Sequence, residues 1–240
     1  MVGDSATVTF RLTSNRPEMY REMTPEAFLE ENMTYMPWIA EEHYYYNDAA
    51  VVSEEMRRQP EIPPLSELVT VEAAAEDLSS FTLTFHVPGA YMFFEYFSTA
   101  FYLISPDQEE PAKIAADMDA VVAKAKGAAT EKQAAQILYK WIGGKVKYNT
   151  PAWHWTDHKV TARDMQTSGE PIGALLYGKC TCGGYSMIYA ILIQQAGILQ
   201  FPISGVILPG YDGHAWNINR LDGEWTETDA TWSRFAWTRE

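Results

Sequence analysis

The chain has 240 residues, and its 18 Lys and Arg against 32 Asp and Glu give a formal net charge of −14. This acidity argues against nucleic acids and anionic membrane surfaces as partners, and no apolar run is long enough to span a bilayer. The length allows one large domain or two small ones. The start, Met1-Val2-Gly3-Asp4, lacks the basic and apolar pattern of a signal peptide.

The first hundred residues predict mainly strands. Alternating apolar and polar residues indicate strands over 6–13 and 79–87, and an aromatic-rich stretch indicates one or two more over 91–104. Thr24 followed by Pro25 predicts the N-cap of a helix that runs to about Asn32. Tyr44-Tyr45-Tyr46 is typical of a strand or of an exposed aromatic patch. We therefore expect residues 1–105 to form a small strand-rich unit, to which the sequence assigns no role.

A second unit, residues 106–240, is expected after the turn signal at Ser105-Pro106. Helical spacing of apolar residues predicts helices over 111–126 and from Thr130, whose capping-box pattern reaches Gln133; Gly143-Gly144 should end the second helix. Residues 149–170 then read as a long polar loop, a kind of segment that is often functional.

Cys182 stands where the next helix is expected to begin. Residues 185–196 are apolar on nearly all sides, which predicts a buried helix that stops at Gly197. Unpaired N–H groups and the helix dipole at the N-terminal end favour a thiolate, and they can also bind an oxyanion. Gly183 and Gly184 allow backbone or substrate to approach closely. Taken alone, Cys182 is more simply a buried structural cysteine.

His214 and Asp229 lie on two alternating segments separated by Leu221-Asp222-Gly223, a hairpin turn signal. A turn at Leu221-Asp222 would set His214 opposite Asp229, and a turn at Asp222-Gly223 would set the two one diagonal step apart. In both registers the side chains share a face, because the side-chain period of a strand is two. The carboxylate can therefore orient the imidazole. Individually, a strand histidine satisfied by a neighbour and a turn or cap aspartate are plausible alternatives.

A thiol, an imidazole and a carboxylate in this order meet the needs of a cysteine nucleophile, its base and the partner that orients the base. The motifs around them resemble the transglutaminase-like superfamily over residues 130–235. The matching segments are Val146-Lys147-Tyr148-Asn149, Cys182-Gly183-Gly184-Tyr185, Ala196-Gly197-Ile198, Gly213-His214-Ala215-Trp216-Asn217 and Asp229-Ala230-Thr231-Trp232. Cys180, two residues before Cys182, departs from the family pattern.

The resemblance, to bacterial-type members, implies an α+β fold. Its papain-like core would pack the Cys-bearing helix on an antiparallel sheet, preceded here by the strand-rich N-terminal unit. It implies Cys182 as nucleophile, His214 as base and Asp229 as orienting acid, acting on amide bonds of peptide or protein substrates. Members of the family crosslink, deamidate, hydrolyse peptides or have lost activity. The resemblance also favours an extracytoplasmic location; no cofactor and no metal are expected, and the oligomeric state is not indicated.

Further candidates line the expected cleft or its oxyanion site: Gly183, Tyr185, Trp216, Trp153 and Trp155. Core packing is the alternative for Trp216, and anchoring of the 149–170 loop is the alternative for Trp153 and Trp155. Two other functions stay open. One is a catalytically silent binding or scaffold module of the same fold, and the other is a redox or zinc site that uses Cys180, Cys182 and His214.

Overall fold

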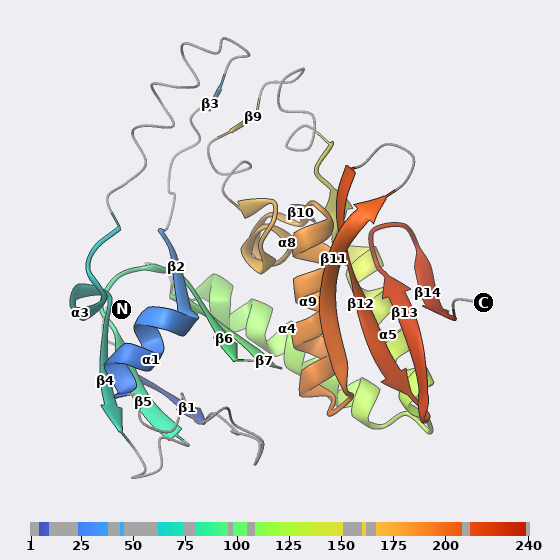
Figure 1. Cartoon of the computed structure of the whole chain (residues 1–240), viewed down its shortest axis with the longest axis horizontal. Helices are drawn as coiled ribbons and strands as arrows, with labels where there is room; N and C mark the ends of the chain where they lie inside the picture. The colour runs from blue at the N-terminus through green and yellow to red at the C-terminus, as the bar shows by residue number, and fades with distance from the viewer. Residues whose placement is uncertain are drawn as a thin grey trace. The chain divides into compact units, whose positions relative to one another are not determined.

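The computed structural model describes residues 5–9, 24–37, 44–45, 62–73, 80–95, 98–104, 109–150, 160–161, 167–207 and 212–238 (Figure 1). The chain divides into two compact units, residues 1–38 with 60–112 and residues 39–59 with 113–240. Helices and antiparallel sheets occur together, which confirms the expected α+β class. The helix α4 (Glu109–Lys126) crosses the division between the units. The domain boundary between residues 105 and 106 stays a proposal.

The described residues of the first unit form two three-stranded antiparallel sheets and the short helices α1 (Pro25–Asn32) and α3 (Leu65–Leu68). Their strand orders are β1-β5-β4 and β2-β6-β7. The strands are β1 (Ser5–Thr9), β2 (Met33–Pro37), β4 (Val69–Ala73), β5 (Ser80–Phe85), β6 (Gly89–Glu95) and β7 (Ser98–Ile104). Leu29, Leu83, Phe85 and Tyr91 are fully buried in its core.

Local sequence signals predict much of this unit. Thr24 caps α1 by accepting a hydrogen bond from the Ala27 N–H at 3.2 Å. The alternation over 79–87 buries Leu83 and Phe85, as expected for a strand with one face in the core. The aromatic stretch forms two strands, β6 and β7. The strands β2 and β4 were not predicted, because each is too short to show a clear period and depends on pairing with a distant partner.

The helix α5 (Glu131–Lys145) begins at its predicted cap but ends later than expected. Thr130 accepts the Gln133 N–H at 3.2 Å. The prediction that Gly143-Gly144 ends the helix is wrong: both glycines are helical, and the helix closes with the Val146 N–H on the Ile142 carbonyl. Glycine costs a helix about 1 kcal/mol relative to alanine, which the burial of Leu138 and Ile142 offsets.

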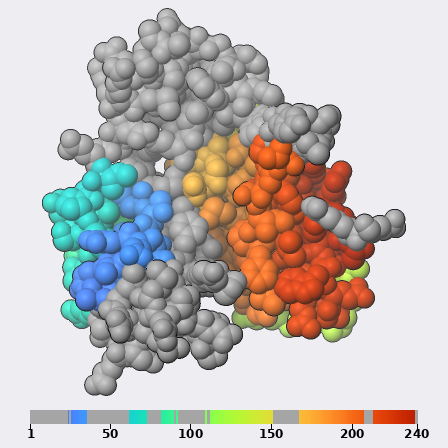
Figure 2. All heavy atoms as spheres, in the orientation of Figure 1, coloured from blue at the N-terminus to red at the C-terminus, as the bar shows by residue number. Residues whose placement is uncertain are grey.

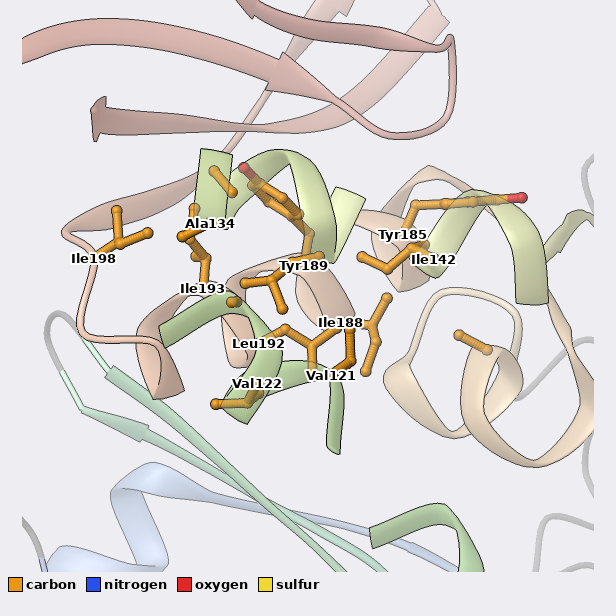
Figure 3. Close-up of a cluster of buried hydrophobic side chains, with 14 of the residues drawn as sticks. Val121, Val122, Ala134, Ile142, Tyr185, Ile188, Tyr189, Leu192, Ile193 and Ile198 are labelled. Carbon is orange, nitrogen blue, oxygen red and sulfur yellow. The ribbon is translucent and has the colours of Figure 1, made fainter. Parts of the chain in front are cut away.

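The helix α9 (Cys182–Gln195) runs through the core of the second unit (Figure 3). It begins at Cys182, where the helix was expected to start. Gly197 ends it with φ +85°, as expected, and the Ile198 N–H bonds the Ile193 carbonyl at 3.1 Å. Side chains from α4 and α5 pack around it in the same cluster.

A four-stranded antiparallel sheet packs against α9 in the order β11 (Gln200–Ile207), β12 (Asp212–Leu221), β13 (Glu224–Asp229), β14 (Arg234–Trp237). Its orange-to-red atoms lie at the surface in Figure 2. The packing of α9 on this antiparallel sheet confirms the arrangement of helix and sheet that the family resemblance implied. The hairpin turn is Asp222-Gly223, with φ of 53° and 91° at the two positions, so the second of the two expected registers is formed.

Short strands complete the second unit. Tyr44-Tyr45 forms the strand β3 and pairs with β9 (Val160–Thr161), which lies within the segment predicted as a loop. The strand β8 (Lys147–Tyr148) pairs in parallel with β10 (Lys179–Cys180), which follows the helix α8 (Pro171–Tyr177). None of the described helices is long and apolar enough to cross a membrane.

Candidate active site

The N-terminal end of α9 presents backbone N–H donors beside the Cys182 thiol. Cys182 is the first helical residue, and the first bond within the helix runs from the Tyr185 N–H to the Thr181 carbonyl. The Thr181 hydroxyl does not cap the helix but donates to the Ser168 carbonyl at 3.1 Å. Among the described residues, no group accepts the N–H of Cys182, Gly183 or Gly184. These donors can therefore stabilise a negative charge at the thiol or on a bound oxygen.

Gly183 and Gly184 let this end of the helix pack closely against neighbouring segments of the chain. A Cβ on Gly183 would lie 2.7 Å from the Gly169 carbonyl oxygen, and one on Gly184 would lie 2.5 Å from the Cβ of Cys180. Both distances are shorter than side chains tolerate. The close approach anticipated at these glycines is thus made by backbone at Gly183 and by the Cys180 side chain at Gly184.

Cys180 is fully buried and packs under the first turn of α9. Burial, and secondarily the neighbouring Cys182, raises the pKa of its thiol to about 12. Both cysteines are free thiols. Across the part of the chain that the structure describes, no group of three His, Cys, Asp or Glu side chains is arranged to hold a metal ion.

His214 and Asp229 meet across the β12–β13 hairpin. Nε2 of His214 lies 2.7 Å from Oδ2 of Asp229, and both side chains are almost fully buried. The other carboxylate oxygen, Oδ1, accepts the N–H groups of Thr231 at 2.9 Å and Trp232 at 3.2 Å. The carboxylate is therefore fixed by the turn that follows β13. Because a carboxylate only accepts, the Nε2–H of His214 donates to it, and Nδ1 is the nitrogen that carries a lone pair in the neutral imidazole.

Two tryptophans lie nearly parallel to the His214 ring. The ring centroid of Trp232 is 4.4 Å away with an interplanar angle of 16°, and that of Trp216 is 5.8 Å away at 18°. The Trp216 Nε1–H donates to Glu227 at 3.0 Å. Trp232 was not among the expected site residues, although it stands three positions after Asp229 in the quoted motif. Its stacking depends on the turn geometry, which a sequence pattern does not display.

Two hydrogen bonds join α9 to β12, and a third joins β12 to the segment that follows the helix. The Ser186 hydroxyl donates to the Trp216 carbonyl at 3.0 Å, and the Asn217 amide donates to the Ser186 carbonyl at 3.1 Å. Beyond the helix, the Arg220 N–H donates to the Leu199 carbonyl at 2.9 Å. The helix and the strand therefore run in the same direction. Within the described residues, no hydrogen bond joins Cys182 to His214.

The other candidate residues have different surroundings. Tyr185 is buried, and its hydroxyl donates to the Val146 carbonyl at 2.8 Å, which ties α9 to the end of α5. Trp153 and Trp155 lie outside the described residues.

Comparison with known proteins gives a match to a family profile and remote structural likenesses. Residues 119–230 match the sequence profile of the Transglutaminase-like superfamily, and no curated protein sequence matches the chain. Among solved structures, the crystal structure of a TGase is 10% identical, with 99% of this chain and 53% of that chain covered and a TM-score of 0.40. The periplasmic domain of TgpA from Pseudomonas aeruginosa is 14% identical, with 71% and 67% covered and a TM-score of 0.36.

This chain thus spans about half the length of that TGase, and both structural likenesses are too remote to bear on activity. The profile match includes the helix that begins at Cys182 and the hairpin that joins His214 to Asp229. Residues 119–230 therefore belong to the transglutaminase-like superfamily.

Proposed function

We propose that the second unit is a cysteine-dependent enzyme that breaks amide bonds of peptide or protein substrates through Cys182, His214 and Asp229. The observation that carries the proposal is the buried hydrogen bond between Nε2 of His214 and Asp229. It assigns the imidazole proton to Nε2 and leaves Nδ1 to accept the proton of a thiol. This is the role of the carboxylate in nucleophile–base–acid triads.

The position of α9 along β12 supports Cys182 as the partner of that imidazole. Cys182 precedes Ser186 by one helical turn, about 6 Å along the helix axis. His214 precedes Trp216 by two strand residues, about 6–7 Å along β12. Since Ser186 is bonded to Trp216 and the two elements run in the same direction, Cys182 and His214 are displaced by similar lengths toward the same end of the unit.

The proposed reaction has two halves. Nδ1 of His214 takes the thiol proton, and the thiolate attacks the carbonyl carbon of the amide while the π electrons move to oxygen. When this alkoxide collapses, the C–N bond breaks, the amine leaves with the proton from Nδ1, and a thioester remains on Cys182. Water then gives a proton to Nδ1 and attacks the thioester; the C–S bond breaks, the proton on Nδ1 returns to the departing sulfur, and the carboxylic acid is released from the regenerated thiol.

The N–H groups at the start of α9 fit the need of the alkoxide. A backbone donor placed at the developing charge contributes about 10²–10³ in rate. The N–H groups of Cys182 and Gly183 are adjacent to the thiol and have no partner among the described residues. We favour hydrolysis over transfer to an amine, since no described feature marks a site for an amine acceptor.

The reactivity of the Cys182 thiol tests the proposal. Iodoacetamide alkylation would be followed from pH 5 to 10 in the full-length protein, with Cys182 read by peptide mass, in the wild type and in His214→Ala. A primed nucleophile should alkylate at neutral pH at least about tenfold faster than an ordinary exposed thiol, and that advantage should be lost when His214 is removed. Wild-type protein should also release p-nitrophenolate from p-nitrophenyl acetate, and Cys182→Ala should not.

An alkylation rate equal to that of an ordinary thiol and unchanged in His214→Ala would overturn the triad and favour a catalytically silent module. Added hydroxylamine separates the two possible second steps. If the acyl-enzyme turns over in water at a rate that a primary amine does not raise, hydrolysis is supported. A large acceleration with formation of the hydroxamate would instead assign acyl transfer.

A further inference from the structure

The two-stranded parallel ribbon β8–β10 brings Tyr148 level with Cys180, two residues before the nucleophile. The pairing is made by the Lys147 N–H on the Gly178 carbonyl and the Asn149 N–H on the Cys180 carbonyl, both at 2.9 Å. Residues that pair in a parallel ribbon place their side chains on the same face. The Cys180 side chain packs against Gly184 in the first turn of α9. Tyr148 therefore faces the helical turn that carries Cys182.

The phenol of Tyr148 is free to contact a ligand. The residue is 36% exposed, and none of the described residues forms a hydrogen bond with its hydroxyl. Tyr185, on the same helical turn as Cys182, differs in this respect, because its hydroxyl is bound to the Val146 carbonyl and buried. Within the part of the chain that the structure describes, the Tyr148 hydroxyl therefore has no structural partner, although it lies beside a candidate nucleophile.

The protonation state of Tyr148 suits a donor. Partial burial, and then the neighbouring thiols of Cys182 and Cys180, raise its pKa to about 12. The phenol is therefore protonated at neutral pH and can donate. It forms no hydrogen bond with the Cys182 sulfur in this structure, which leaves the hydroxyl available to an atom bound at the sulfur.

We propose that the Tyr148 hydroxyl donates a hydrogen bond to the oxygen of a substrate carbonyl under attack by Cys182. This role rests on the proposed function, since it needs the thiolate attack that creates the charged oxygen. As the C–S bond forms, the carbonyl π electrons become a lone pair on oxygen, and the phenol stabilises that lone pair without giving up its proton. When the C–N bond breaks, the carbonyl re-forms and the hydrogen bond weakens. The phenol thus complements the N–H groups of Cys182 and Gly183.

Two reagents separate this role from an effect on the thiolate. Iodoacetamide alkylates Cys182 by displacement at an sp³ carbon, so no oxyanion develops. p-Nitrophenyl acetate acylates the same sulfur through a tetrahedral alkoxide. The second-order rate constants for both would be measured on full-length wild type and Tyr148→Phe at the same pH, with Cys182→Ala as background.

Tyr148→Phe should acylate about tenfold more slowly, less than the 10²–10³ lost with an enclosed donor because the phenol is partly exposed. Alkylation should stay within about twofold of wild type, because the nucleophile is unchanged. The melting temperature should also be unchanged, since no hydrogen bond among described residues is lost. Tyr35→Phe is the matched control: it removes a hydroxyl bound to the Pro88 carbonyl in the other unit, and should leave both rate constants as they are.

Equal acylation rates in wild type and Tyr148→Phe would overturn the proposal, and so would a fall of the same factor in both reactions, which would assign Tyr148 to the thiolate or to the fold. These outcomes are distinct from a failure of the proposed function. In that case wild-type Cys182 would itself react as an ordinary thiol, whatever residue stands at position 148.

Discussion

Asp229 holds His214 with one carboxylate oxygen, at 2.7 Å from Nε2, and is itself held by backbone N–H groups on the other. The hydrogen bond to the imidazole fixes which nitrogen carries the proton. The bonds to Thr231 and Trp232 fix where the carboxylate points. The same side chain therefore has an electrostatic task and a structural task, and substitutions can separate them.

Asp229→Asn should keep the structural task and lose the electrostatic one. Its amide oxygen can still accept from Thr231 and Trp232, so the melting temperature should change little. If the amide nitrogen then faces His214, Nε2 must accept, and the proton moves to Nδ1, where it opposes thiol deprotonation. We expect acylation by p-nitrophenyl acetate to fall at least about 10²-fold. Asp229→Ala should show the same loss together with a lower melting temperature, and a full rate in Asp229→Asn would contradict the assigned tautomer.

Trp232 should matter to the reaction more than to stability. It stacks on His214 at 4.4 Å while 46% of its surface remains exposed. Removal of the ring admits water to the buried imidazole–carboxylate pair and weakens their interaction. We expect Trp232→Ala to lower the acylation rate by about three- to tenfold, with an unfolding free energy reduced by about 1 kcal/mol. Trp232→Phe, which can still stack, should retain most of the rate; a loss as large as that of alanine would argue against stacking as the cause.

Gly183 is expected to be intolerant of a side chain, whereas Gly144 is not. A Cβ at position 183 would meet the Gly169 carbonyl oxygen at 2.7 Å, and one at position 144 would meet nothing within 4 Å. Gly183→Ala should destabilise the protein by about 1–3 kcal/mol. Gly144→Ala, inside the exposed end of α5, should stabilise it by about 0.5–1 kcal/mol. Urea denaturation of both variants measures the contrast, and similar effects at the two positions would be inconsistent with the tight contact.

Asp222 links the hairpin turn to the start of α5. Its carboxylate accepts the N–H groups of Glu131 at 2.8 Å and Lys132 at 3.3 Å, while its own N–H donates to Glu131. Its φ of 53° also favours Asp, Asn or Gly. Asp222→Asn should cost about 0.5–1 kcal/mol through loss of charge at the helix N-terminus. Asp222→Ala should cost about 1–2 kcal/mol, because the cap and the favourable turn residue are both lost. Equal stability of all three proteins by thermal melting would show that the contact contributes nothing.

Cys180 should make the fold sensitive to alkali. Its folded pKa of about 12 lies above the value of an unfolded thiol, about 8.5, so the unfolded chain releases its proton first. The contribution of the protonated Cys180 thiol to the free energy of unfolding is therefore fully present below about pH 8.5. It is lost as pH rises toward 12, by up to about 1.36 kcal/mol per pH unit. Urea titrations between pH 8 and 10 should show this fall, and Cys180→Ala should show a shallower one. An unchanged slope in that variant would assign the effect to other groups.

The helix and hairpin of the candidate site could be predicted because their signals are local. The apolar run after Cys182 and the glycine at position 197 delimit α9 to within one turn. The period of a strand and the turn at Asp222-Gly223 place His214 and Asp229 on one face before any tertiary contact is considered. The N-cap of α5 at Thr130 could also be predicted from a local signal, since its hydrogen bond joins residues three positions apart.

Other features depended on contacts between distant segments. The continuation of α5 through Gly143-Gly144 reflects burial of neighbouring residues, which outweighs the intrinsic cost of glycine. The stack of Trp232 on His214 depends on how the chain turns after β13.

Sequence by itself therefore determined the order of thiol, imidazole and carboxylate, the elements that carry them and the shared face of the last two. Tertiary structure alone decided that Tyr148 stands level with Cys180 and that α9 and β12 run in the same direction. The two-residue period of a strand and the 3.6-residue period of a helix can be recognised from the spacing of apolar residues along the sequence. A two-residue parallel strand is too short to show a period, and its partner lies some thirty residues away, so only packing selects the pairing.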